Sequence, residues 1–202
     1  MPGRSSVGST LGRFGSSSRR TSETEVEISI ELDGEGRFEG NTGLKFLDHM
    51  LAQLAFHSLS DLKVSAKWDL AHHGVEDTAI ALGKAIGEAL GEREGINRFG
   101  HALVPMDESL VSVAVDLVRR AYVDVDLKLT GTRVEDVATE DVVHFLESMV
   151  MNVPAVAHIE VLRGLNDHHK VEAAFKALAL ALRQAWTLNP RYASGRSTKG
   201  RV

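Results

Sequence analysis

Cysteine is absent from the 202-residue chain, which excludes disulfide bonds, thiolate metal ligands and a cysteine nucleophile. Tryptophan and tyrosine are scarce, with two of each. No uninterrupted apolar run approaches the roughly 18 residues that a membrane-spanning helix needs. The net charge of −5 and the pI near 6.0 argue against broad binding to nucleic acids. The hydrophobic share of 43% is ordinary for a globular chain, whereas nine histidines are unusual.

The first 22 residues differ from the rest of the chain. They contain seven serines, four glycines and four arginines, and no acidic residue. Such a composition buries too little apolar surface to become ordered, so it predicts a mobile basic tail over residues 1–22. A cleaved organelle-targeting peptide is the alternative interpretation, because such peptides are also rich in Arg and Ser and poor in acids.

Two series of strand and helix signals follow this tail. Alternating apolar residues predict strands, and apolar residues three and four apart predict helices. The first series predicts strands over 26–32 and 62–66, and helices over 44–59 and 72–90. The second predicts strands over 111–117, 123–129 and 157–162, and helices over 139–152 and 167–186. Strands, helix, strand and helix therefore occur in the same order twice.

The two series are also related in their letters. His72-His73-Gly-Val-Glu76 lies 96 residues before His168-His169-Lys-Val-Glu172, and Phe46-Leu-Asp-His-Met50 lies 99 residues before Phe145-Leu-Glu-Ser-Met149. Two matches at nearly one spacing indicate an internal duplication. The predicted fold class is therefore α+β with two similar halves, each a small, mostly antiparallel sheet with two helices on one face. The predicted parts are the tail 1–22, repeats over 23–95 and 96–187, and a C-terminal tail over 188–202.

Histidine and glutamate recur on the predicted long helices at a spacing suited to metal binding. Residues four apart share a helix face, so each HHxxE segment places a histidine beside its glutamate. Adjacent histidines point about 100° apart, which favours two metal ions over one. Each short helix adds one histidine. The 99-residue spacing matches His49 with Ser148 and Lys45 with His144, which are one turn apart on the same face. The predicted ligands are His49, His72, His73, Glu76, His144, His168, His169 and Glu172.

The types of ligand narrow the choice of metal. Imidazole and carboxylate without thiolate favour Mn, Fe, Co or Zn over Mg and Ca. The spacing differs from HExxH, which excludes that zinc-protease motif. Of the other histidines, His57 lies about two turns after His49 and is a candidate substrate contact. His101 and His158 lie in strand-like surroundings and are expected to be structural.

Eight short words occur in order from about Arg19 to Gly200. They are Thr21-Ser-Glu23-Thr24, Phe46-Leu-Asp-His49-Met50, His72-His73-x-x-Glu76-Asp77, Arg98-Phe-Gly100, Pro105-Met-Asp-Glu108, His144-Phe145, Asp167-His168-His169-x-x-Glu172 and Ser197-Thr-Lys199-Gly200. In this order they resemble the imidazoleglycerol-phosphate dehydratase family of histidine biosynthesis.

The resemblance implies a cytoplasmic homo-oligomer, a cubic shell of 24 subunits with active sites shared between subunits. It implies two Mn²⁺ ions per active site, held by the eight predicted ligands. The implied substrate contacts are Glu23, His49, His57, Arg98, Arg120, Lys176, Ser197, Thr198 and Lys199. This chain has Arg119-Arg120-Ala121 where the family usually has Gly-Arg-Pro, so the choice between Arg119 and Arg120 stays open.

The implied reaction dehydrates imidazole glycerol phosphate to imidazole acetol phosphate. The proton leaves a carbon with no adjacent carbonyl group, so metal ions at the ring nitrogens would act as Lewis acids and as a template. Glu23 is the candidate acid/base, with Glu76 and Glu172 as alternatives. Arg98, Arg120 and Lys199 suit a phosphate clamp, because guanidinium and ammonium groups bind phosphate oxygens strongly.

Three other functions use the same ligands. A metal-storage or buffering oligomer would bind the ions without turnover, and a structural oligomer would use them only to join helices. A dinuclear hydrolase would use the paired ions to activate water. Storage needs no phosphate-binding tail, so Ser197-Thr198-Lys199 favours the lyase over storage. For a purely structural oligomer, imidazole-containing phosphates should leave the spectrum of the metal unchanged.

Overall fold

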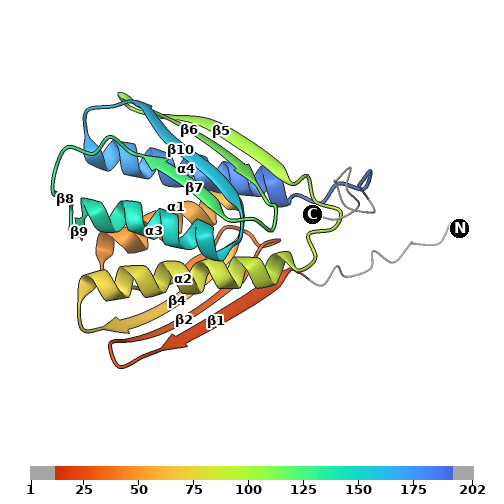
Figure 1. Cartoon of the computed structure of the whole chain (residues 1–202), viewed down its shortest axis with the longest axis horizontal. Helices are drawn as coiled ribbons and strands as arrows, with labels where there is room; N and C mark the ends of the chain where they lie inside the picture. Colours follow the sequence, from red (N-terminus) through yellow and green to blue (C-terminus); the bar gives the residue numbers. More distant parts are fainter. Residues whose placement is uncertain (1–11, 193–202) are drawn as a thin grey trace, which may run out of the picture.

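The computed structural model describes residues 12–192. The first half contains β1 (Phe14–Arg20), β2 (Thr24–Glu31), β3 (Phe38–Asn41), α1 (Lys45–Ser58), β4 (Asp61–Trp68) and α2 (Ala71–Leu90). The second half contains β5 (Phe99–Met106), β6 (Ser109–Asp116), β7 (Tyr122–Asp126), the short strands β8 (Arg133–Val134) and β9 (Val137–Ala138), α3 (Thr139–Asn152), β10 (Val156–Arg163) and α4 (Asp167–Trp186). Figure 1 shows these elements along the chain.

Each half forms one four-stranded mixed sheet. The strand orders are β1-β2-β4-β3 and β5-β6-β10-β7. The first three strands of each sheet are antiparallel, whereas β3 and β7 are parallel to β4 and β10. A parallel pair needs a crossover connection, and α1 and α3 supply it. The prediction of an α+β fold with two similar halves, each a mostly antiparallel sheet with two helices, is confirmed.

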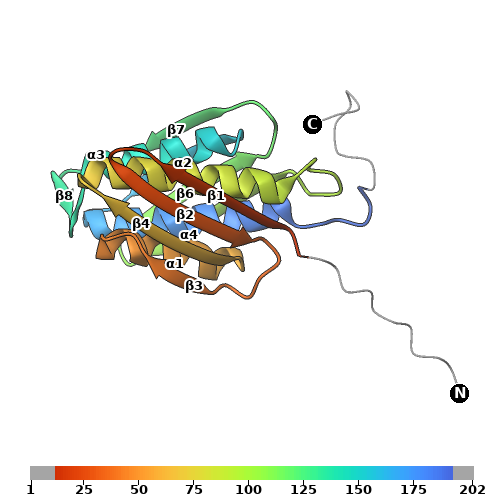
Figure 2. The same ribbon diagram turned by 90° about the horizontal axis from the view of Figure 1, so that it is seen from below.

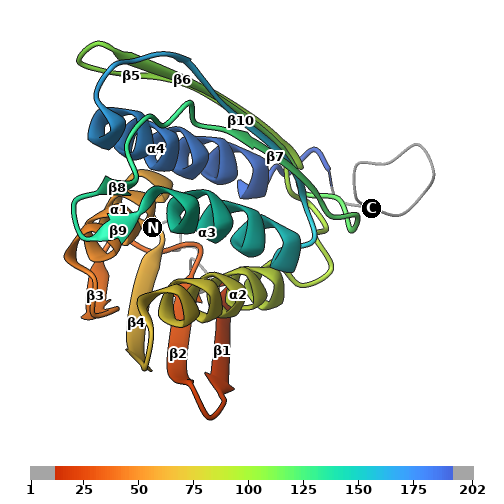
Figure 3. The same cartoon turned by 60° about the vertical axis from the view of Figure 1, so that its left-hand side comes forward.

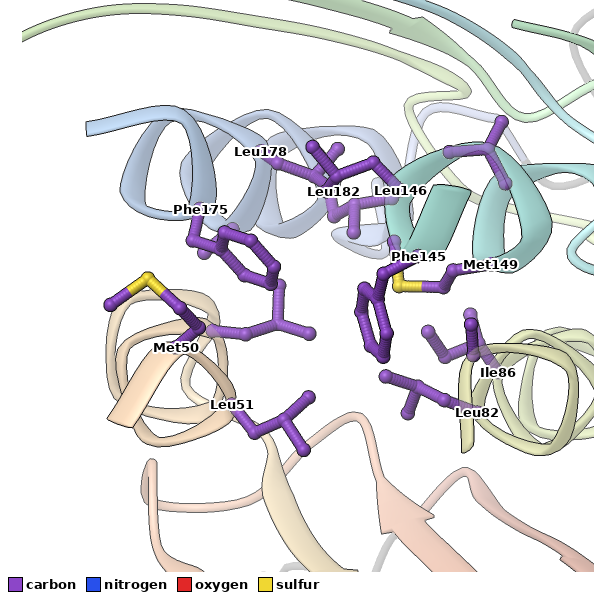
Figure 4. Packing of buried hydrophobic residues seen from close by; sticks show 14 of the residues in the cluster. Met50, Leu51, Leu82, Ile86, Phe145, Leu146, Met149, Phe175, Leu178 and Leu182 are labelled. Carbon is purple, nitrogen blue, oxygen red and sulfur yellow. The ribbon is translucent and has the colours of Figure 1, made fainter. Parts of the chain in front are cut away.

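The two sheets enclose the four helices. Figures 2 and 3 show the helices between the sheets, with α1 beside α4 and α2 beside α3. Alternating strand residues such as Val26, Ile28 and Ile30 point to this layer and are almost fully buried. Figure 4 shows apolar side chains of all four helices converging, among them Leu51, Leu82, Phe145 and Phe175. The core therefore joins the two halves. None of the helices described is both long and apolar enough to cross a membrane.

The first strand contradicts, for residues 14–20, the prediction of a mobile tail over residues 1–22, of which residues 1–11 lie outside the described part of the chain. Residues 14–20 form β1 and pair with β2 along its whole length. Their serines suit this place because backbone hydrogen bonds to β2 order the strand without an apolar sequence. Arg13-Phe14-Gly15 also repeats as Arg98-Phe99-Gly100 at the start of β5. That repeat is a signal for β1 that the composition of the segment concealed.

Most predicted elements are present with bounds that shift by a few residues. The helices over 139–152 and 167–186 have the predicted bounds. Strands β3 and β5 and the β8–β9 hairpin were not predicted. β3 is four residues long, and β8 and β9 are two residues long each. Such segments are too short to give an alternating apolar pattern.

The buried positions of the short helices change the alignment of the two halves. α1 buries residues 46, 47, 50, 51, 54 and 55, and α3 buries 141, 142, 145, 146, 149 and 150. Each position in α3 is 95 residues after its counterpart, so His49 corresponds directly to His144. The match of His49 with Ser148 and of Lys45 with His144 is wrong by one helical turn. A shift of four residues returns to nearly the same helix face, so the apolar pattern did not reveal the error.

Candidate metal centres

Two groups of three ligands form between the halves. The α1/α4 cluster contains His49, His168 and Glu172, and the α2/α3 cluster contains His72, Glu76 and His144. In each group one nitrogen or oxygen atom from every residue lies within 4.8 Å of the others. Each cluster takes a histidine from the short helix of one half and an HxxxE pair from the long helix of the other half. The packing of α1 on α4 and of α2 on α3 brings them together.

The α1/α4 cluster is held by hydrogen bonds on several sides. Glu172 Oε2 lies 3.3 Å from His49 Nε2 and 3.1 Å from His168 Nε2. Its other oxygen, Oε1, accepts from the Lys176 ammonium at 2.7 Å. Burial would raise the pKa of Glu172, but the Lys176 ammonium and His49 outweigh it and the pKa is lowered. His168 Nδ1 lies 3.1 Å from Glu135 Oε1, so Glu135 favours the tautomer with the proton on Nδ1 and a lone pair on Nε2.

The α2/α3 cluster has a different environment. His72 Nδ1 lies 2.6 Å from the buried carboxylate of Asp141, and the His72 and His144 rings stack at 5.4 Å. His144 Nε2 lies 3.5 Å from Glu76 Oε1. The Glu76 side chain is 40% exposed, against 8% for Glu172. Ile80 stands where the other long helix has Lys176, so α2 itself supplies no ammonium group at the corresponding position beside Glu76.

His73 and His169 lie outside both clusters. Their rings are 6.3 and 6.1 Å from those of their neighbours His72 and His168. A hydrogen bond to Asp69 raises the pKa of His73, and one to Glu108 raises the pKa of His169. The structure therefore groups six of the eight predicted ligands and turns the remaining two towards other carboxylates.

Glu23 and Glu108 occupy matching places just before β2 and β6. Glu23 Oε2 lies 3.9 Å from His73 Nδ1, and its side chain is 56% exposed. It lines a surface hollow of about 400 Å³ with Lys67 and Trp68. Glu108 instead accepts backbone N–H groups from residues 165 and 166 and a hydrogen bond from His169. Those donors lower the pKa of Glu108 strongly, so this carboxylate is poorly suited to carry a proton.

Two further predicted substrate contacts lie near the α1/α4 cluster. Lys176 pairs with Glu172 and also approaches Met106. His57 lies two turns after His49 on α1, where burial and then the charge of Lys176 lower its pKa. A neutral imidazole is therefore favoured at His57 near neutral pH.

The predicted phosphate-binding arginines lie at the other end of the molecule. The backbone N–H of Arg98 donates to the backbone carbonyl of Ala185, which lies seventeen residues after His168 on α4. Arg119 reaches the carbonyl of Gly91, which ends α2. A rise of 1.5 Å per residue puts these ends about 25 Å from the histidines at the helix starts. The structure therefore does not bring Arg98, Arg119 or the adjacent Arg120 to a cluster of their own chain. Figure 1 shows α2 and α4 running the length of the molecule between these two ends.

The arginines also differ in their partners. The Arg98 guanidinium makes two hydrogen bonds to the Asp116 carboxylate, and these raise its pKa. Arg119 pairs with Glu92. For Arg120 no ion pair forms among the residues that the structure describes, and its side chain is exposed. Ser197, Thr198 and Lys199 lie outside the described residues.

Sequence reasoning missed the carboxylates that support the histidines. Asp141 precedes His144 by three residues on α3, a spacing that places both on one side of the helix and could have drawn attention to it. Glu135 gave no such signal, because it belongs to a hairpin that was not predicted. The donors of both clusters are imidazole nitrogens and carboxylate oxygens, a set that fits Mn²⁺ and related divalent transition metals.

Comparisons with known proteins agree with these features. A sequence profile described as imidazoleglycerol-phosphate dehydratase matches residues 42–182. The chain is 50% identical to the protein of that name from Dehalococcoides mccartyi, over 93% of this chain and 96% of the relative. It is 49% identical to that from Moorella thermoacetica, over 90% and 94%. The crystal structure of the Staphylococcus aureus enzyme superimposes with a TM-score of 0.79 at 34% identity, covering 87% of this chain and 99% of the other.

Proposed function

The chain belongs to the imidazoleglycerol-phosphate dehydratase family, and on that premise we propose that its two clusters bind two divalent metal ions, with Mn²⁺ preferred. It is a hydro-lyase of histidine biosynthesis that removes water from imidazole glycerol phosphate to give imidazole acetol phosphate. The observation that carries the metal proposal is the pair of matching three-ligand clusters, each drawn from both halves. The bound ions would supply Lewis acidity and a template for the imidazole ring of the substrate.

Each cluster supplies three ligands, and His73 and His169 are available as further ligands. They lie on the same long helices but face away from the clusters of their own chain. We propose that they complete metal sites in neighbouring subunits of a homo-oligomer, a 24-subunit shell as in the family. The distance from the arginines to the clusters supports the same arrangement. Arg98 and Arg120 can meet a substrate at a metal centre only if the centre belongs to a neighbouring subunit.

Glu23 is our choice for the acid/base group. It is exposed, beside His73 and in a surface hollow, so it can contact a substrate and exchange a proton. Glu172 is less suited because Lys176 stabilises its charged form. Within residues 12–192 no such cation pairs with Glu76, which remains the second choice.

The remaining residues recognise the substrate in this proposal. His49, His57 and Lys176 would contact it near the α1/α4 cluster. Arg98 and Arg120 would bind its phosphate from a neighbouring subunit, together with Ser197, Thr198 and Lys199 of the C-terminal segment. Asp116 would fix the direction of the Arg98 guanidinium. We also propose a cytoplasmic location, as for the family.

Mixed oligomers test the shared site. Arg120→Ala should lose activity, whereas Arg119→Ala, a matched control whose charge is already paired with Glu92, should keep most of it. A His72→Ala/His168→Ala double variant should lose activity and most bound Mn²⁺. When the double variant and Arg120→Ala are co-expressed in equal amounts, an Arg120→Ala subunit supplies intact clusters and a double-variant subunit supplies an intact Arg120. Up to about a quarter of the shared sites then contain both, so activity should return.

Each outcome has a distinct meaning. If the mixed oligomer stays inactive although both parents are folded and assembled, the active site lies within one chain. If Arg120→Ala is fully active, Arg120 does not bind substrate. If the double variant retains both metal ions, measured by elemental analysis, the two clusters are not the metal sites.

A further inference from the structure

The two clusters differ in how their long-helix histidine is supported. In the α2/α3 cluster the Asp141 carboxylate, from the first turn of α3, holds His72 Nδ1 at 2.6 Å. The matching position of α1, 95 residues earlier, is Phe46. Its ring packs against the His168 ring with centroids 5.1 Å apart but offers no hydrogen-bond acceptor. The duplicated position therefore supplies only an apolar contact to His168.

Glu135 provides the missing acceptor from elsewhere in the chain. Its carboxylate lies 3.1 Å from His168 Nδ1, on the opposite side of the ring from Glu172. Glu135 lies in the two-residue turn between β8 and β9. A carboxylate on the second nitrogen of a ligating histidine fixes its tautomer and raises its basicity. His168 Nδ1 thus donates to Glu135, its Nε2 faces the Glu172 carboxylate of the cluster, and one face of its ring packs against Phe46.

Asp136, the next residue of the turn, supports the other helix of the cluster. Its two carboxylate oxygens accept the backbone N–H groups of Lys45 at 2.7 Å and Phe46 at 3.0 Å. The residue that precedes α1, Leu44, cannot cap the helix with its side chain. The carboxylate therefore caps α1 from the other half of the molecule and also faces the positive end of its dipole. This fixes the start of the helix that carries His49.

The backbone conformation of the turn is unfavourable for a glutamate at position 135. Glu135 has a φ of 52°, in the left-handed region that glycine adopts more readily. A glycine would serve a two-residue hairpin turn at least as well. The glutamate side chain therefore has no local conformational advantage at this position, and its contact with His168 is the only interaction of the carboxylate among those described.

We propose that the Glu135–Asp136 turn is a positioning element for the α1/α4 cluster, with Glu135 orienting His168 and Asp136 orienting the helix of His49. The inference rests on the proposed metal binding at that cluster. It assigns to the turn the task that Asp141 performs at the α2/α3 cluster. The two metal centres therefore depend on different supporting residues and can be perturbed separately.

Metal titration in two single-site backgrounds tests this proposal. A His72→Ala background leaves the α1/α4 cluster, and a His168→Ala background leaves the α2/α3 cluster. In the first background, Glu135→Gly should weaken Mn²⁺ binding by about tenfold, the lower end of the usual 10- to 100-fold effect because Glu135 is exposed. In the second background it should change nothing. Asp141→Ala should show the reverse pattern.

Two controls separate positioning from a general effect on the fold. Glu135→Gln should restore most of the affinity, because its amide oxygen still accepts from Nδ1–H. Lys128→Gly is the matched control: Lys128 also has a left-handed backbone, with a φ of 50°, but its side chain is directed to Asp126 and Glu160. It should leave Mn²⁺ affinity unchanged. The thermal midpoint of metal-free Glu135→Gly should equal or exceed that of the parent.

The outcomes separate this inference from the function on which it rests. If the parent backgrounds bind no Mn²⁺, the metal proposal fails and the positioning role falls with it. If they bind Mn²⁺ and Glu135→Gly binds it equally well, only the positioning role is wrong. Equal weakening in both backgrounds, or a clear fall in the metal-free midpoint, would show a structural effect instead.

Discussion

Gly100→Ala provides a sharp test of how the second sheet packs on its long helix. β5 crosses α4 at Gly100, and a Cβ atom built there would lie 1.9 Å from the carbonyl oxygen of Ala181 and 2.9 Å from the amide nitrogen of Ala185. Both neighbours are backbone atoms of a helix, so neither can move aside as a flexible side chain could. The first half repeats the arrangement at Gly15, where the Cβ would lie 2.0 Å from the carbonyl oxygen of Ala85.

The size of the effect follows from these distances. Ordinary Cβ contacts begin near 3.4 Å, so the strand must withdraw from the helix by about 1.5 Å. Added atoms in a well-packed core typically cost 1–3 kcal/mol. Because the clash is with rigid backbone, we expect about 3 kcal/mol for Gly100→Ala and a similar loss for Gly15→Ala. For a chain of this length, 3 kcal/mol lowers the thermal midpoint by about 6–12 °C.

The assay is urea unfolding at a fixed protein concentration, followed by circular dichroism. Gly87→Ala is the matched control. Gly87 lies inside α2, and its nearest neighbour to an added Cβ is 3.7 Å away, an ordinary contact. Alanine is favoured over glycine in a helix interior, so this variant should gain up to about 1 kcal/mol.

The reasoning is refuted if Gly100→Ala unfolds at the same urea concentration as the wild type, since the strand would then tolerate a side chain at the crossing. It is also refuted if Gly87→Ala is destabilised as much as Gly100→Ala. That result would mean that any added methyl group is harmful and that the close approach is irrelevant.

Three other predictions concern the core, a buried ion pair and acid stability. Phe145→Ala should lose about 3–5 kcal/mol in urea unfolding because its ring is buried among all four helices, whereas exposed Met151→Ala should lose almost none. Lys170→Met should cost about 3–5 kcal/mol, since the buried ammonium donates to Asp167 and to the carbonyl of Lys128 at 2.8 Å; an unchanged urea midpoint would contradict this. The pKa of Asp61 is lowered because backbone N–H groups outweigh its burial. A carboxyl group whose pKa is lower in the folded chain than in the unfolded chain stabilises the fold at pH values above its unfolded pKa, which is near 4. This stabilisation is lost as the pH falls through the folded pKa. Asp61→Asn should therefore flatten the loss of stability below pH 4, measured as urea midpoints against pH, and an unaltered profile would count against it.

The sequence alone determined the duplication, the fold class, all four helices and the residue types of the candidate metal ligands. These features depend on local periodicity and on residue identity, which are readable without tertiary contacts. The HHxxE segments recur in matching frames, and the helices over 139–152 and 167–186 have the predicted bounds. The serine-rich composition concealed β1, because the order of that strand comes from backbone pairing with β2 and from its close packing on α2.

Only the tertiary structure decided which ligands meet. Helix periodicity defines the face on which His49 or His168 lies but not the helix that faces it, and a one-turn error in register leaves that face almost unchanged. Because α1 packs on α4 and α2 packs on α3, each candidate centre contains residues from both halves. It also turned His73 and His169 away and separated Arg98 from the clusters by the length of a helix. Supporting residues such as Glu135 come from hairpins whose position depends on the whole fold.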